Sequence, residues 1–275
     1  MKQISLYTGI ATLIVLMFTS CKDDIDFNYH SVHAIYVVDG ELCNKGINVD
    51  ISKTLQMTDT TDRDAVNNAT VLLSGDDGTE ETLVCDSAGT YHSPSDIKAK
   101  KGITYTLKVT IGENSYTSYS TMQDTVSIDS ASFKWDKIMN EDMLYYKVDI
   151  KDIANQDNYY CYRMYRNGKI YKWGVFSDLG YKNGEIKYSI VCMSKKKADK
   201  NDPSDYDNIL YEGDNIHLDI LSIDNRTYNY LYSLKLSTKD NSNPISNFDG
   251  GCLGYFAAYG KVSHDDVFSY NDVGE

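Results

Sequence analysis

The stretch TYTLKVTI, residues 104–111, predicts a strand with one buried face. Tyr, Leu, Val and Ile alternate in it with Thr and Lys, and successive side chains of a strand point to opposite faces of a sheet. Gly112-Glu113-Asn114 then forms a turn signal, and residues 115–121 return as a partner strand. The stretch is therefore half of an antiparallel hairpin.

Comparable strand patterns recur on both sides of this hairpin. They cover residues 32–41, 47–53, 69–74, 81–85, 131–135, 144–150, 159–166, 169–176, 185–193, 215–223 and 254–262. Asn167-Gly168 joins two of them, and this dipeptide is typical of a two-residue hairpin turn whose central residues both need a positive φ. Asp76-Asp77-Gly78 is a second turn signal.

One segment has a helical pattern instead. After the capping residue Asp224, Tyr228, Leu231, Tyr232 and Lys235 recur at three- and four-residue spacing, which predicts a helix over residues 225–237. Many strands and one short helix indicate a mainly β protein of two antiparallel β-sandwich domains, of the immunoglobulin or transthyretin-like type. We predict these domains at residues 31–125 and 126–275, with the helix in the second.

The N-terminus predicts export and lipid attachment. Residues 1–20 combine Lys2 with the apolar run IATLIVLMF, a length typical of a secretory signal and too short to span a bilayer. Phe18-Thr19-Ser20-Cys21 resembles a bacterial lipobox, so Cys21 is the predicted lipid attachment site and residues 21–30 a tether in contact with the lipid bilayer. An ordinary secretory signal is the alternative. Lys22-Asp23-Asp24 resembles the surface-export signal of Bacteroidota lipoproteins, although it could also be a solvated linker.

Charge excludes one class of partner. Without residues 1–20 the chain has 26 Lys and Arg against 40 Asp and Glu, a net charge of −14. Nucleic-acid binding requires phosphate neutralisation by basic residues, so we expect no nucleic-acid partner. The chain also contains 24 Tyr, a residue suited to half-buried strands and to sugar or protein contact surfaces.

Candidate chemistry is sparse. The chain carries no HExxH, GxSxG or phosphate-loop motif, so we predict no catalytic residue, no metal site and no cofactor. The acids between Asp199 and Asp207 could bind calcium, but they lack the Gly and closing Glu of the known calcium loop. Spacing alone leaves open whether any disulfide forms among five cysteines, which are Cys43, Cys85, Cys161, Cys192 and Cys252.

The later motifs resemble one known family. The most specific is NPISNFDGGCLGYFAAY, residues 243–259, and three others precede it. These are YTLKV with SYT and STM (105–122), DNYY with Arg163 (157–163), and ILYEG (209–213) followed by the Tyr228 helix. Together they resemble the Bacteroidota outer-membrane lipoproteins of domain of unknown function 4249. Cys252 is a mild departure, because a small or apolar residue is usual there.

The resemblance implies an outer-membrane lipoprotein, often encoded beside a TonB-dependent transporter, and no established activity. We therefore expect a surface-exposed, non-enzymatic binding or accessory subunit of such an uptake system, with an unknown ligand. The alternatives are a surface hydrolase of glycan or peptide, and an adhesin or envelope structural protein. A possible binding or partner loop contains the following residues: Asn243, Pro244, Asn247, Asp249, Gly250, Gly251 and Tyr255. Its glycines also suit a purely structural turn and a close approach of two backbones at Gly254.

Overall fold

The computed structural model describes residues 33–56, 60, 63–153, 156–181, 184–195, 208–240 and 242–274. The elements below all belong to the unit Ala34–Glu275. The strands of its first half are β1 (Tyr36–Cys43), β2 (Gly46–Lys53), β3 (Asp64–Ala65), β4 (Thr70–Gly75), β5 (Glu80–Ser87), β6 (Thr90–His92), β7 (Thr104–Ile111) and β8 (Asn114–Thr121). The later elements are β9 (Ser127–Ile138), β10 (Glu141–Lys151), β11 (Tyr159–Arg166), β12 (Lys169–Ser177), β13 (Glu185–Cys192), β14 (Asn215–Ile223), α3 (Asn225–Asp240), β15 (Leu253–Val267) and α4 (Tyr270–Val273).

The long strand β15 joins the two halves of the chain. Its first part pairs in parallel with β1, from Val37 opposite Leu253 to Cys43 opposite Tyr259. Its second part pairs antiparallel with β14. Among the described strands this gives a 12-stranded sheet in the order β12-β11-β14-β15-β1-β2-β6-β5-β4-β7-β8, with β3 beside β2, and a separate sheet in the order β13-β10-β9.

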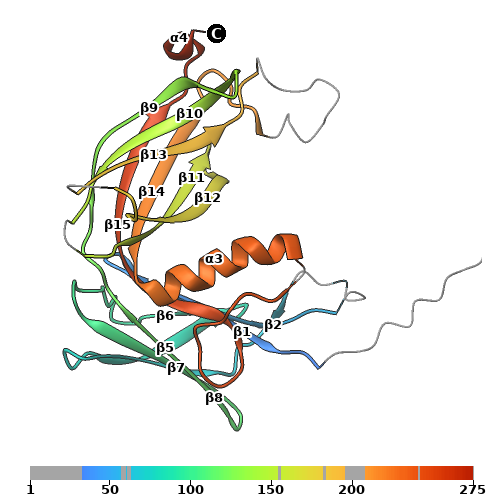
Figure 1. The fold of residues 1–275 in the computed structure, drawn as a ribbon. Coiled ribbons are helices and arrows are strands. Elements are labelled where there is room, and N and C mark those ends of the chain that lie inside the picture. The colour runs from blue at the N-terminus through green and yellow to red at the C-terminus, as the bar shows by residue number, and fades with distance from the viewer. Residues whose placement is uncertain are drawn as a thin grey trace, which may run out of the picture. The chain divides into compact units, whose positions relative to one another are not determined.

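Three clusters of buried side chains hold these layers together. The first lies inside the β1–β8 half, where β5, β7 and β8 form a layer beside β1, β2 and β6 (Figure 1). The second lies between the β13-β10-β9 sheet and the strands β11, β14 and β15. The third lies beneath α3, which packs on β11, β12 and β15. The fold is thus mainly β, with sandwich-like sheets, as the alternating patterns predict.

Helix α3 begins where its capping residue predicts. The Asp224 Oδ1 atom accepts a hydrogen bond of 2.8 Å from the backbone N–H of Thr227, which satisfies one free donor of the first turn. Its Oδ2 atom accepts bonds from the Ser120 hydroxyl, at 2.6 Å, and from the Thr121 N–H, at 3.1 Å. One carboxylate therefore caps the helix and fixes it to the end of β8.

Several local predictions are confirmed. Residues 104–111 form β7, and the turn between β11 and β12 has φ of 50° at Asn167 and 79° at Gly168, as an Asn-Gly hairpin requires. The five cysteines after Cys21 are all free thiols in the described chain.

Other predictions need correction. β3, β6 and the second helix α4 were not predicted, because elements of two to four residues are too short to show a period. β1 begins at Tyr36 rather than residue 32 and extends to Cys43. The domain boundary at residues 125 and 126 stays a prediction, although Phe248, Cys252 and Phe256 from beyond it pack in the first core.

Candidate functional site

Strand β1 carries acidic side chains on the face that it turns away from the first core. Val38 and Leu42 have no exposed surface and belong to that core. Because strand side chains alternate, Asp39, Glu41 and Cys43 point to the opposite face, and Cys43 packs against the cluster beneath α3. A half-buried carboxylate is costly unless hydrogen-bond donors or a positive charge compensate it.

Glu41 finds its partners on two other strands. Arg163 of β11 donates two hydrogen bonds to it, one from each terminal nitrogen, and the bond from Nη1 to Oε2 is 3.0 Å long. Tyr255 and Tyr259 of β15 donate their hydroxyls, Tyr255 to Oε1 and Tyr259 to Oε2, the latter at 2.8 Å. Both carboxylate oxygens therefore accept two hydrogen bonds, and the cluster ties β1, β11 and β15 together.

The electrostatics keep this carboxylate charged. Burial by itself would raise the pKa of Glu41, but the hydrogen bonds and charge of Arg163, followed by the bonds from Tyr255 and Tyr259, hold it below its ordinary value. The pKa of Arg163 is raised by its pairing with Glu41, which outweighs the lowering effect of burial. Because Glu41 is charged and fully bonded, it is a poor proton donor or acceptor for a substrate.

Asp39, two residues earlier, has the opposite character. It lies directly across from Asp50 on β2. Burial, followed by the charges of Asp50 and Glu41, raises its pKa to about 6, and Arg63 offsets this only in part. At neutral pH the folded protein therefore holds an ionised Asp39 against a free-energy penalty.

This penalty predicts that Asp39→Asn stabilises the protein at neutral pH. A folded-state pKa above the unfolded value makes folding less favourable as the pH rises from about 4 to 6, and the penalty persists at higher pH. Removing the charge should therefore raise the free energy of unfolding by about 2 kcal/mol at pH 7 and hardly at pH 3.5. Urea unfolding at the two pH values measures this. Asp142→Asn, at an exposed position on β10, is the matched control. An equal effect of Asp39→Asn at both pH values would contradict the assignment.

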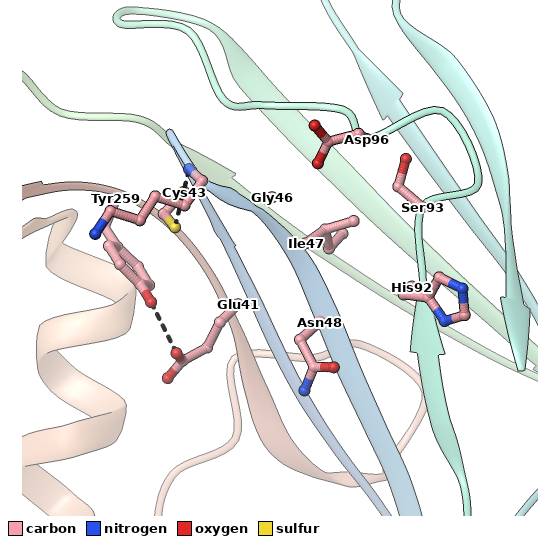
Figure 2. A pocket seen from close by; sticks show the side chains of 10 residues that line it. Glu41, Cys43, Gly46, Ile47, Asn48, His92, Ser93, Asp96 and Tyr259 are labelled. Carbon is pink, nitrogen blue, oxygen red and sulfur yellow. Dashed lines mark hydrogen bonds between the residues drawn. The ribbon is translucent and has the colours of Figure 1, made fainter. Parts of the chain in front are cut away.

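A pocket of about 400 Å³ adjoins the Glu41 cluster, and Tyr259 and Glu41 belong to both. Its other lining residues are Cys43, Lys45, Gly46, Ile47, Asn48, His92, Ser93 and Asp96. Figure 2 shows the side chains of β1 and β15 on one side of it and His92 of β6, with Ser93 and Asp96 of the following loop, on the other, with the start of β2 between them. The turn after β1 and the loop after β6 thus form a recess at one end of the sheet.

The buried thiols are poor nucleophiles. Burial raises the pKa of Cys161 to about 11, and those of Cys192 and Cys252 to about 12. Reactive cysteines act as thiolates, and these three remain protonated near neutral pH. They serve as small apolar side chains in the core.

The predicted binding loop is held tightly to the fold. The Asn247 side chain donates to the Phe256 carbonyl and accepts from the Phe256 N–H, both at 2.9 Å, and it also accepts from the Ser118 hydroxyl. Asp249 pairs with Thr117 through backbone bonds in both directions. The most buried polar member of the loop therefore has a structural role, and a binding role for the loop stays a prediction.

The glycines of this motif allow close backbone contacts. A Cβ atom on Gly250 would lie 2.5 Å from the Ser115 carbonyl oxygen, and one on Gly254 would lie 2.0 Å from that of Val38. Gly251 has φ of +88° with open space around it. Asn243 is exposed and Pro244 half-buried, while Tyr255 lies apart from the loop, beneath α3 and bonded to Glu41.

Other predicted sites lie outside the described residues. These are Cys21, Lys22, Asp23, Asp24 and the acidic loop from Asp199 to Asp207. Within the described ranges, no helix has the length and apolarity to cross a membrane. The described His, Cys, Asp and Glu side chains also form no group of three or more that could hold a metal ion.

Helix α3 presents a row of apolar side chains to solvent. Tyr228 stacks on Tyr232, with ring centroids 5.9 Å apart and planes 15° from parallel, and on its other side contacts Tyr159 of β11 at 5.0 Å. Tyr232 and Leu236 are 48% and 42% exposed. Ile245, 69% exposed, lies beside them, because its N–H donates to the Ser233 hydroxyl of α3. We use the name α3 surface for the following five residues: Tyr159, Tyr228, Tyr232, Leu236 and Ile245.

Sequence reasoning found only part of these sites. Arg163, Tyr255 and Tyr259 all lie in the quoted motifs, but Glu41 is only the last residue of the predicted strand 32–41. A signal was available in YVVDGELC, residues 36–43, where two acids share one face of an otherwise apolar strand. Two acids on one face of a buried strand call for a basic partner, and Arg163 supplies it.

These sheets and helices define a mainly β protein with sandwich-like packing. The chain belongs to the family described as Domain of unknown function (DUF4249), whose model matches residues 22–265. No curated protein matches the chain. Among solved structures, a two fibronectin type-III domain segment from chicken tenascin is matched at 10% identity and a TM-score of 0.23, over 86% of this chain and 99% of that one.

Proposed function

We propose that this protein is a surface-exposed lipoprotein of the bacterial outer membrane, and that it acts as a non-enzymatic binding or accessory subunit of a TonB-dependent uptake system. The lipobox-like Cys21 and the Lys22-Asp23-Asp24 run support the anchor and its outward orientation. The observation that carries the binding role is the α3 surface, where apolar side chains are exposed together in an otherwise strongly acidic, hydrated chain.

The composition of the α3 surface suits a protein partner. Tyrosine is among the residues most enriched at the centres of protein interfaces, because its ring buries a large area with little conformational entropy to lose. Tyr228 and Tyr232 already restrict each other by stacking, which lowers the cost of ordering them on binding. A lipid anchor keeps this surface close to a membrane partner, so modest affinity is sufficient.

The buried groups argue against catalysis at the Glu41 cluster. A general acid or base needs a free position for the substrate's proton, but each carboxylate oxygen of Glu41 already accepts two hydrogen bonds, from Arg163 and from Tyr255 or Tyr259. The cluster therefore suits a structural role, and it gives no support to the alternative of a hydrolase.

The test is affinity purification from solubilised outer membranes, with quantitative mass spectrometry. We expect a TonB-dependent transporter to co-purify with the wild-type protein in near-equal amount, and its recovery to fall at least tenfold with Tyr232→Ser combined with Leu236→Ser, since central interface residues carry most of the binding energy.

The matched control is Val84→Ser combined with Val191→Ser. These two side chains are 42% and 47% exposed, so a similar apolar exposure is removed elsewhere, and recovery of the transporter should be unchanged. A wild-type protein that purifies alone would refute the accessory role. Equal losses with both pairs would refute the assignment to the α3 surface.

A further inference from the structure

We propose that the pocket beside Glu41 is a binding site for a small organic carboxylate, with Lys45 as its counter-ion. The pocket is separate from the α3 surface and has a volume of about 400 Å³. Sites for small molecules typically measure about 300–1,000 Å³ and combine apolar walls with a few polar groups. The charges of the lining residues indicate which class of ligand fits.

The acidic residues of the pocket are already paired within the protein. Glu41 is bonded to Arg163 and to two tyrosine hydroxyls. The Asp96 carboxylate lies 3.2 Å from the ammonium of Lys98. A cationic ligand would have to compete with these internal partners, so the two acids do not define a site for an amine.

The lysine of the pocket remains accessible. The ammonium of Lys45 forms no ion pair with any residue that the structure describes, and Lys45 is exposed at the rim. The ring of His92, on β6, lies 3.9 Å from the Asp86 carboxylate, so His92 already has an acidic partner within the protein. Although the whole chain is acidic, charges more than about 8 Å away are largely screened at physiological ionic strength. Since Glu41, Asp96 and His92 each have a charged partner within the protein, Lys45 is the unpaired charge of the described lining, and it favours an anion.

The remaining lining favours an anion with a flat apolar body. Ile47 is 7% exposed and closes the pocket on the β2 side, while Cys43 and Tyr259 contribute a thiol and an aromatic ring (Figure 2). The Asn48 amide donates to Asp50 and leaves its carbonyl oxygen as an acceptor. An aromatic monocarboxylate could place its ring among these groups and its charge at Lys45.

The probe for this site is 4-hydroxybenzoate, titrated into the ¹⁵N-labelled mature protein and followed by NMR. A ligand of this size should bind with a Kd of about 1 mM. We expect shifts centred on the backbone amides of Gly46, Asn48 and Ser93. The neutral isostere 4-hydroxybenzamide should bind at least tenfold more weakly, because it cannot form a charge-assisted hydrogen bond.

Lys45→Gln should weaken binding of 4-hydroxybenzoate about tenfold or more. Lys108→Gln changes the net charge equally at an exposed position on β7 that does not line the pocket, and should leave the affinity unchanged. Equal affinity for the acid and the amide, unchanged binding by Lys45→Gln, or shifts centred elsewhere would each overturn the proposal. The readout is independent of the transporter, so it succeeds or fails separately from the accessory role.

Discussion

Arg163→Ala is expected to lower the free energy of unfolding by about 3–5 kcal/mol, because it leaves the Glu41 carboxylate half-buried without its charged partner. The two tyrosine hydroxyls would remain, but neutral donors compensate a charge less well than a guanidinium. Urea denaturation of the purified protein without residues 1–20 measures the change. A loss below 1 kcal/mol would show that Glu41 is well solvated without Arg163.

A double-mutant cycle separates the pair from its surroundings. Removing both charges with Glu41→Leu and Arg163→Met should destabilise the protein less than the sum of the two single changes, because neither charge is then left unpaired. Arg163→Lys should fall between the wild type and Arg163→Ala, since an ammonium keeps the charge but loses the two-pronged geometry. Strictly additive single effects would contradict a direct interaction.

Gly254→Ala is expected to destabilise the protein by more than about 4 kcal/mol or to prevent folding. The new Cβ would lie 2.0 Å from the carbonyl oxygen of Val38 and 2.7 Å from its carbonyl carbon, so β1 and β15 would have to separate. Gly254 also has φ of +101°, where a side chain is strained. Thermal unfolding, with soluble yield as a second measure, tests this.

Gly251→Ala is the matched control for Gly254→Ala. Gly251 has a similar φ of +88°, but a Cβ there would meet nothing within 4 Å. It should therefore show only the backbone strain, about 1–2 kcal/mol. The difference between the two variants measures the close contact between β1 and β15. Similar losses for both would mean that conformation alone, and not the contact, requires Gly254.

The sequence predicted features that depend on neighbouring residues. The alternation in β7, the Asn-Gly turn at residues 167–168 and the Asp224 cap each depend on a few consecutive positions, and each is observed. These local patterns predict structure because the residue types that a turn requires, and the alternation of side chains in a strand, are set within two to four consecutive positions.

The contacts that form the candidate site could not be predicted in this way. Glu41 and Tyr255 are 214 positions apart, and nothing in either strand states that β1 and β15 are neighbours. The exposure of Tyr232 depends on which face of α3 meets the sheet. Periodicity identifies a buried face, but it does not identify the element that covers it. The pocket likewise needs three segments, around Cys43, His92 and Tyr259, to meet.

The pairing of β1 with β15 also has a consequence for the order of folding. β1 is the first described strand, and one of its two neighbours is β15, the last strand. Its hydrogen bonds are therefore complete only after nearly the whole polypeptide has been synthesised. Pairings between such distant positions raise the contact order, and folding slows as the contact order rises. For the exported lipoprotein that we propose, such a delay would help to keep the chain unfolded during export, because the pairing of β1 waits for the C-terminal strand.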